Sequence, residues 1–215
     1  MSSYLSDIEV IGPLYFVNEE LGFVEGRNNE TMGSMIYKTI DGGYNWYETT
    51  VPTPENDPLI PGNYWITKFF FLDENHGWTS CIIGFGLGVS LFTQDGGETW
   101  EVGVEPGFSE FFDIHFINPD QGGIAGLYHV LITQDNFETY TYHYFGQNWA
   151  IHFQDESIVW VSSQNYIKKS INGGISFDEY QIIDTSYLDK IQFFGNTGYI
   201  FGSDNSLLNI LKIMK

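Results

Sequence analysis

One eight-residue motif, which occurs four times, constrains the fold of this chain more than any other feature. Its clearest copy reads Thr-Gln-Asp-Gly-Gly-Glu-Thr-Trp over residues 93–100 and lies between two stretches rich in β-forming residues. Two adjacent glycines suit a tight turn with positive φ, and an aspartate can accept hydrogen bonds from the backbone of that turn. The other copies begin at Thr39, Thr133 and Ser170. The motif therefore predicts a β-hairpin at each of four places.

A second pattern lies upstream of every copy and occurs once more near the end of the chain. An aromatic residue ends one strand, and a glycine or valine opens the next strand six residues later, or five in the last case. The five pairs are Phe16 and Gly22, Phe71 and Gly77, Phe116 and Gly122, Phe153 and Val159, and Phe193 and Gly198. Together the patterns define a four-stranded unit of roughly 40 residues, the repeat length of a propeller blade. We therefore expect an all-β fold: a five-bladed β-propeller of four-stranded antiparallel blades, forming a single domain over residues 1–215.

The strand count also predicts how the ring closes. The fifth unit has sequence for only three strands, because the chain ends soon after residues 207–214. Residues 7–11 form an additional β-rich stretch ahead of the first unit. The simplest arrangement gives this N-terminal strand to the last blade as its fourth strand. Residues 51–63 hold four prolines and are expected to form an extended loop between the first two blades.

The four motifs resemble the Asp-box, Ser/Thr-x-Asp-x-Gly-x-Thr-Trp, of BNR-repeat propellers. The longer repeat, with its Phe, its Asn or Asp and its Gly-aromatic pair, resembles the photosystem II assembly factor type of BNR protein. In that family the boxes lie at the blade periphery, away from the ligand face. The resemblance therefore implies a structural role, which turn chemistry also favours, for Asp41, Asp95, Asp135 and Asn172.

Composition excludes several classes of partner. The formal net charge is −20, with 28 acidic and 8 basic side chains, so neither nucleic acid nor an anionic membrane surface is an expected partner. No apolar run reaches the roughly 18 residues of a membrane-spanning segment. The single cysteine, Cys81, cannot form an intramolecular disulfide and is expected to be buried. We expect a monomer.

The compartment is inferred from the resemblance. The first residues lack the basic and apolar regions of a signal peptide. Because Asp-box propellers are often exported, we expect a secreted protein, extracellular or periplasmic, whose leader has been removed. A cytoplasmic location is the alternative.

A binding face is predicted around the propeller axis, where the loops that join one blade to the next meet the loops between the second and third strands of each blade. Aromatic rings beside amides and carboxylates suit the recognition of sugars or peptides. The candidate ligand-binding residues are Tyr64, Trp65, Tyr128, His129, Asn148, Trp149, Asn165, Tyr166, Tyr187 and Asp189.

Catalysis is the less favoured interpretation. Arg27 is the only arginine, so the three-arginine site of a sialidase is excluded. Another glycoside hydrolase would need two carboxylates across a cleft, for which the candidates are Glu110, Asp113, Asp189 and Asp204.

Metal and cofactor sites are not predicted. His115 and His152 occupy equivalent positions in adjacent repeats, but no third ligand follows from the spacing. No phosphate-binding loop is present, because the glycines at 84–88 are not followed by Lys-Ser/Thr. We therefore expect no cofactor, no metal and no catalytic residue.

The sequence thus favours a non-enzymatic module that binds carbohydrate or protein on its loop face. The alternatives are an assembly or scaffold protein of the photosystem-factor type, which would use the same face, and a glycoside hydrolase.

Overall fold

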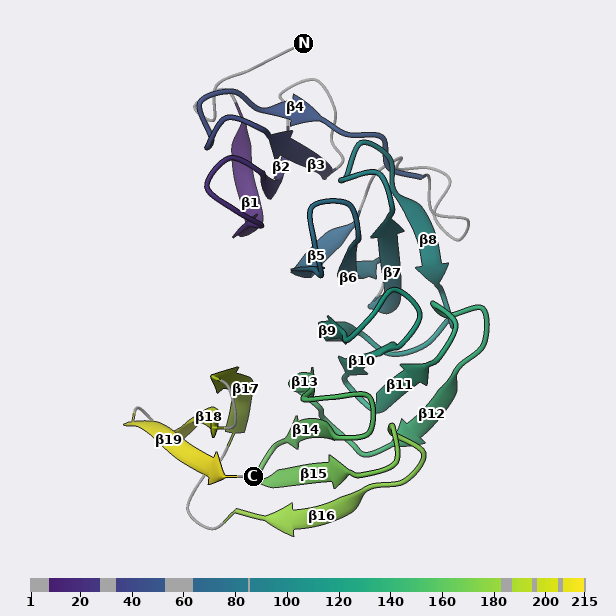
Figure 1. Ribbon diagram of the computed structural model, residues 1–215, viewed down its shortest axis with the longest axis vertical. Helices are drawn as coiled ribbons and strands as arrows, with labels where there is room; N and C mark the ends of the chain where they lie inside the picture. The colour runs from purple at the N-terminus through teal and green to yellow at the C-terminus, as the bar shows by residue number, and fades with distance from the viewer. Residues whose placement is uncertain are drawn as a thin grey trace. The chain divides into compact units, whose positions relative to one another are not determined.

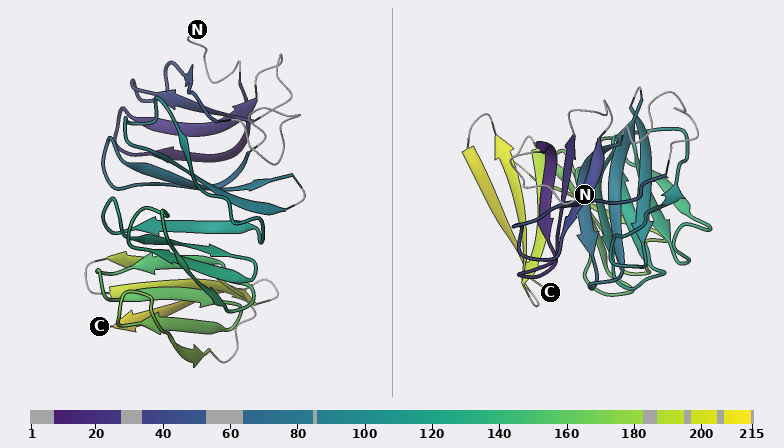
Figure 2. Two further views of the ribbon diagram at one scale, coloured as in Figure 1. Left: turned by 90° about the vertical axis from the view of Figure 1, so that its right-hand side faces the viewer. Right: turned by 90° about the horizontal axis from the view of Figure 1, so that it is seen from above.

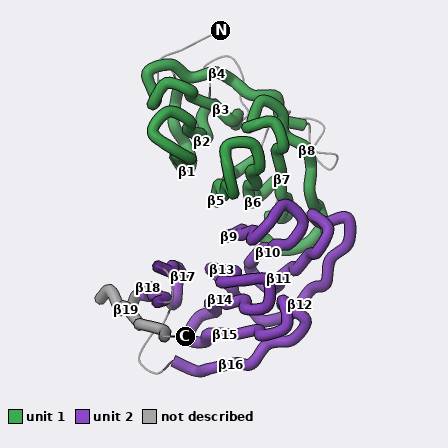
Figure 3. The backbone as a smooth tube through the Cα atoms, in the orientation of Figure 1, with its two compact units in different colours: residues 1–111 green, residues 112–215 purple. Residues whose placement is uncertain are grey.

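The computed structural model describes residues 8–27, 34–52, 64–84, 86–182, 187–194, 197–204 and 207–214 (Figure 1). These residues form antiparallel strands and turns, with no helix among them. No helix in this part of the chain is therefore long and apolar enough to span a membrane. Two compact units can be distinguished, Met1–Phe111 and Phe112–Lys215 (Figure 3). The organisation of the whole chain as one domain stays a prediction.

The first unit contains two four-stranded sheets. In each sheet, strands that follow one another in the sequence are hydrogen-bonded neighbours. The first sheet consists of β1 (Glu9–Phe16), β2 (Gly22–Arg27), β3 (Met35–Thr39) and β4 (Tyr47–Glu48). The second consists of β5 (Trp65–Phe71), β6 (Gly77–Ile83), β7 (Leu87–Thr93) and β8 (Glu101–Val104). Strands β1 and β5 lie beside each other, so the two sheets pack face to face (Figure 2).

The second unit contains three more sheets, to which β9 (Phe111–Phe116) contributes from the unit boundary. The first sheet continues with β10 (Gly122–Gly126), β11 (His129–Thr133) and β12 (Thr141–Tyr144). The second holds β13 (Ala150–Phe153), β14 (Val159–Ser163), β15 (Tyr166–Ser170) and β16 (Asp178–Gln181). The third holds β17 (Tyr187–Phe194), β18 (Thr197–Asp204) and β19 (Leu207–Met214). The all-β architecture of antiparallel four-stranded sheets is confirmed; a closed ring of five blades stays a prediction.

The predicted strand at residues 7–11 is not a separate element in the described part of the chain. Glu9 and Val10 are the first residues of β1 and pair with Arg27 and Gly26 of the first sheet. A register shift between Val10 and Leu14 accommodates the Gly12-Pro13 step within this strand. Proline is tolerated there because β1 is an edge strand. The fifth sheet has three described strands, so strand pairing does not confirm closure by the N-terminal strand.

The spacing of aromatic residue and glycine has a direct structural cause. Phe71 and Gly77 are opposite each other on β5 and β6, and the phenyl ring lies on the glycine. A Cβ added to Gly77 would lie 2.3 Å from the Phe71 ring. The same ring-on-glycine contact occurs between Phe16 and Gly22, Phe116 and Gly122, and Phe193 and Gly198. In these four pairs the ring covers the glycine, as when an aromatic residue shields a strand glycine from water, and a larger side chain there would displace the ring.

A short polar turn connects the two strands of each pair. Asp73 Oδ1 accepts hydrogen bonds from the backbone N–H groups of Asn75 and His76 at 2.7 and 2.8 Å. Asn18, Asn118 and Asp155 make the equivalent contacts in the other sheets. In these four sheets, a side-chain oxygen two residues after the aromatic residue thus fixes the turn.

The Asp motif closes its turn with a small hydrogen-bond network. Thr93 Oγ1 donates to Asp95 Oδ1 at 2.8 Å and accepts from the Gly97 N–H at 2.9 Å. Asp95 also accepts from Thr99, at Oδ1 from the backbone N–H and at Oδ2 from the hydroxyl. Asn172 Oδ1 accepts from the Ser170 hydroxyl and the Ser176 N–H, while its Nδ2 donates to the Ser176 hydroxyl. Asp41 and Asp135 accept bonds equivalent to those of Asp95, which agrees with a structural role for these side chains.

We expect Asp95→Ala to lower the free energy of unfolding by about 1 kcal/mol, the usual cost of losing a side chain that caps backbone N–H groups. Asp95→Asn should cost less, because Asn172 supports the same turn in the fourth motif. Urea unfolding of the two variants measures the difference. Equal losses would show that charge, and not hydrogen-bond geometry, stabilises this turn.

Candidate functional site

Two of the predicted ligand-binding residues are buried. Tyr64 precedes β5 in the aromatic core of the first unit, and burial raises the pKa of its hydroxyl. Asn148 Nδ2 donates to the carbonyls of Gly126 and Gly146 at 3.1 and 2.5 Å. Because both side chains are buried, they do not belong to an exposed binding surface. Sequence reasoning placed them there because their positions between blades are usually exposed.

The two predicted tryptophans have different surroundings. The Trp149 ring stacks on Phe112, with ring centroids 4.9 Å apart and planes 18° apart. Trp65 is 61% exposed at the start of β5. Together with Arg27, Ile82 and Gly84 it lines a hollow of about 160 Å³. This hollow is smaller than the roughly 300–1,000 Å³ of typical ligand pockets.

The remaining predicted residues in the later repeats are not brought together. The Asn165 carbonyl accepts from the Ile182 N–H, and the Tyr166 ring lies 5.4 Å from Lys168 Nζ. Asp189 is exposed on β17. Tyr187 begins β17, and its side chain lies outside the described part.

Tyr128 and His129 do belong to a cluster, and two tyrosines that the prediction missed complete it. The cluster, called here the tyrosine patch, consists of Tyr128, His129, Tyr142 and Tyr144. The ring centroids of Tyr128 and Tyr144 lie 6.2 Å apart with planes at 11°. The His129 ring meets Tyr142 and Tyr144 edge-on at 5.9 and 5.5 Å. The three tyrosines are 45%, 63% and 71% exposed in chain order.

Strand pairing explains why these side chains gather. His129 is opposite Tyr144, and Leu131 is opposite Tyr142, across β11 and β12. Side chains alternate along a strand, so Tyr142 and Tyr144 lie on the same face. His143 faces the other way, where its Nε2 donates to the Gly174 carbonyl at 2.8 Å and its ring contacts Phe145 and Phe177. The alternation at residues 140–144 was visible in the sequence, but the partner strand was needed to identify the patch.

The patch carries no positive charge near neutral pH. Partial burial lowers the pKa of His129 below its ordinary value. Its imidazole therefore stays uncharged where an ordinary histidine begins to protonate. The surface is one of neutral aromatic rings with hydroxyl groups at their edges, a composition enriched at protein interfaces.

Of the side chains considered for catalysis or for a metal, Asp113 and His115 accept hydrogen bonds from backbone N–H groups. Both Asp113 oxygens accept backbone hydrogen bonds at 2.9 Å, Oδ1 from Ile114 and Oδ2 from Ile151. His115 Nδ1 accepts from the Phe153 N–H, and the His115 and His152 rings lie 4.3 Å apart. Among the described residues no three His, Cys, Asp or Glu side chains are grouped as metal ligands. The side chain of Asp204 lies outside the described part.

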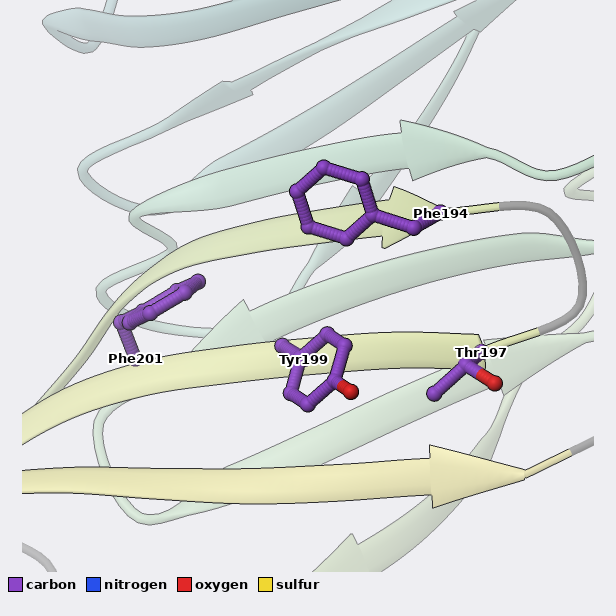
Figure 4. Close-up of a pocket in the computed structure, with 4 residues that line it drawn as sticks. All are labelled: Phe194, Thr197, Tyr199 and Phe201. Carbon is purple, nitrogen blue, oxygen red and sulfur yellow. The ribbon is translucent and has the colours of Figure 1, made fainter.

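A second apolar surface lies on the fifth sheet. Phe194, Thr197, Tyr199 and Phe201 line a hollow of about 520 Å³ (Figure 4). The opposite face of this sheet, with Leu188, Ile191 and Ile200, is buried against Ala150 and Trp160. Among the described residues, its wall carries the hydroxyl groups of Thr197 and Tyr199 and no charged side chain, so it has little to fix the orientation of a small ligand.

Comparison with known proteins shows a resemblance in sequence and in fold. No family model matches the chain. Over 102 residues it is 30% identical to the photosystem II assembly protein Ycf48 of Thermosynechococcus vestitus. The matched segment covers 46% of this chain and 26% of that protein, so the similarity spans about a quarter of the relative.

Solved structures show the fold. Ycf48 from Cyanidioschyzon merolae superposes with a TM-score of 0.59 at 20% identity, covering 89% of this chain and 66% of that chain. An ancestral GH74 enzyme superposes with a TM-score of 0.64 at 12% identity, covering 95% and 31%. The chain has a propeller-like fold and resembles Ycf48. Identities this low indicate fold alone, because one fold carries many functions.

Proposed function

We propose that this chain is a protein-binding module of the assembly or scaffold type, and that the tyrosine patch is its contact surface. The observation that carries the proposal is the group of three exposed tyrosines around His129, two on β12 and one directly before β11. Contiguous exposed aromatic surface on a soluble fold marks interaction sites. The sequence resemblance to an assembly protein supports the protein-binding alternative over a carbohydrate-binding module.

Tyrosine also suits such a surface energetically. It offers a large rigid contact area with only two side-chain torsions to fix, so little conformational entropy is lost on binding. Stacking between Tyr128 and Tyr144 restrains the rings before a partner arrives. Aromatic residues of this kind are enriched among those that dominate binding energy.

The test is quantitative cross-linking in cells of the source organism, with partners identified by mass spectrometry. Wild type is compared with Tyr142→Ser/Tyr144→Ser and with a control, Tyr44→Ser/Tyr180→Ser, which removes two exposed tyrosines outside the patch. We expect at least one protein to lose about tenfold in yield with the patch variant alone, as expected for interface hot spots. Equal yields from all three proteins would overturn the proposal.

A glycan array with the same three proteins tests the carbohydrate interpretation. Glycan binding that is lost only in the patch variant would reassign the surface to sugar recognition. Because the replacements are exposed, circular dichroism of each variant should match wild type.

A further inference from the structure

The distribution of charge along the chain bears on what the patch binds. No lysine or arginine occurs between Lys68 and Lys168, a stretch with thirteen acidic residues. Strands β6 to β14, and the tyrosine patch with them, lie wholly within this stretch. These residues contribute acidic side chains and no lysine or arginine of their own, so the cations of an approaching partner are favoured over its anions.

The second unit also shows how its aromatic faces receive cations. Lys168 Nζ lies 4.8 Å from the centroid of Phe145, the residue that follows β12, and it also pairs with Glu179. Lys169 Nζ lies 4.8 Å from the centroid of Trp160, its cross-strand neighbour. Both are within the distance at which an ammonium group is attracted to a ring face. The tyrosine patch offers exposed rings of the same kind.

We propose that the tyrosine patch binds a segment of another protein that carries Lys or Arg, with the cationic side chains lying on the Tyr142 and Tyr144 rings. This inference rests on the proposed function and adds the chemistry of the partner. A second copy of this chain is a poor occupant, because each copy carries a net charge of −20. Arginine is the better fit, since its planar guanidinium stacks on aromatic faces.

The test uses a fluorescent peptide of alternating arginine and glycine, titrated against the full chain by anisotropy. The matched control peptide has citrulline for arginine, which keeps the shape and removes the charge. We expect the arginine peptide to bind about tenfold more tightly than the citrulline peptide, and about tenfold more tightly to wild type than to Tyr142→Ser/Tyr144→Ser. Tyr142→Phe/Tyr144→Phe keeps the rings and should keep most of the binding.

The serine variant separates the patch from general attraction to an acidic protein, because it leaves the net charge unchanged. Equal binding of the arginine peptide to wild type and the serine variant would overturn the inference. So would equal binding of the arginine and citrulline peptides. Loss of binding in the phenylalanine variant would also contradict it, because the hydroxyl groups would then be the recognised feature.

The two proposals fail in different experiments. Suppose that cross-linking of a cellular partner depends on the patch, but binding of the arginine peptide does not. The proposed function would then stand, and the inference that the partner segment is cationic would be rejected. Patch-dependent binding of the arginine peptide without any patch-dependent cellular partner would leave the affinity of the tyrosine rings for arginine standing and remove the role of the patch as a protein-binding surface.

Discussion

Replacing Trp100 with alanine is expected to lower the free energy of unfolding by about 3–5 kcal/mol, the usual cost of truncating a buried aromatic side chain. Trp100 is 3% exposed and ends the second Asp motif. Its ring meets Phe23 and Phe71 edge-on, each with centroids 6.0 Å away, and lies 6.2 Å from Phe69. These phenylalanines come from both sheets of the first unit. Alanine would therefore leave a cavity where the two sheets pack.

The matched control is Tyr140→Ala, at the same position of the third motif. Tyr140 is 37% exposed, so its truncation is expected to cost less than about 1 kcal/mol. Urea unfolding followed by far-ultraviolet circular dichroism measures both variants. Losses of equal size would show that the aromatic residue stabilises the turn locally and does not fill the core.

The third motif shows where a sequence pattern predicts a turn and misses its packing. It lacks both glycines, yet Asn136 and Phe137 adopt the positive φ values of 51° and 66°. The Phe137 ring is buried and meets Phe116 edge-on at 5.7 Å. In this motif the buried aromatic residue is therefore the fifth, and not the eighth as in the second motif. The turn was predictable from Thr133 and Asp135, whereas the position of the buried ring depends on the neighbouring strand.

Repeated local chemistry made most of the fold predictable. The aromatic residue, the polar turn and the glycine lie within seven residues of one another, so their contacts follow from spacing alone. The extent of strand β1 was not predicted. Residues 7–11 were expected to form a separate strand, whereas Glu9–Phe16 is one strand whose edge position tolerates Pro13.

The candidate site was less predictable because it depends on burial and register. Tyr64 and Asn148 looked like surface residues, and only the packed structure shows them buried. Tyr142 and Tyr144 looked like ordinary strand residues, and the register of β11 against β12 places them around His129. Contacts between strands are long-range information that a motif of eight residues does not contain.

Replacing Glu25 with glutamine is expected to remove most of a pH dependence of stability in the first unit. Glu25 is fully buried on β2, and its Oε2 accepts the Ile66 N–H of β5 at 3.2 Å. Burial raises the pKa of the carboxyl from 4.5 to about 7, against smaller lowering effects that include the charge of Arg27. A Cβ added to Gly12 would lie 1.8 Å from Oε2, so the carboxyl fills the space against β1. The group therefore sits where three strands of two sheets meet.

The sign of the effect follows from the direction of the pKa shift. The folded state binds the Glu25 proton more tightly than the unfolded chain does. The contribution of Glu25 to the free energy of unfolding is therefore fully present below pH 4.5. This contribution, up to about 3 kcal/mol, is lost as the pH rises through about 7. Glutamine has no proton to lose and can still accept the Ile66 N–H through its carbonyl oxygen. Wild type and Glu25→Gln should therefore have similar stability near pH 5, and the variant should be the more stable near pH 8.

Urea unfolding at several pH values between these limits gives the stability difference between the two proteins, in which every other titrating group cancels. Glu101→Gln is the control, because it removes an exposed carboxylate from β8 and should leave the pH profile parallel to that of wild type. A difference between wild type and Glu25→Gln that stays constant with pH would mean that Glu25 is ionised and paired in the folded state. In that case the carboxylate would hold β5 against β2 through charge, and glutamine would weaken the first unit equally at every pH.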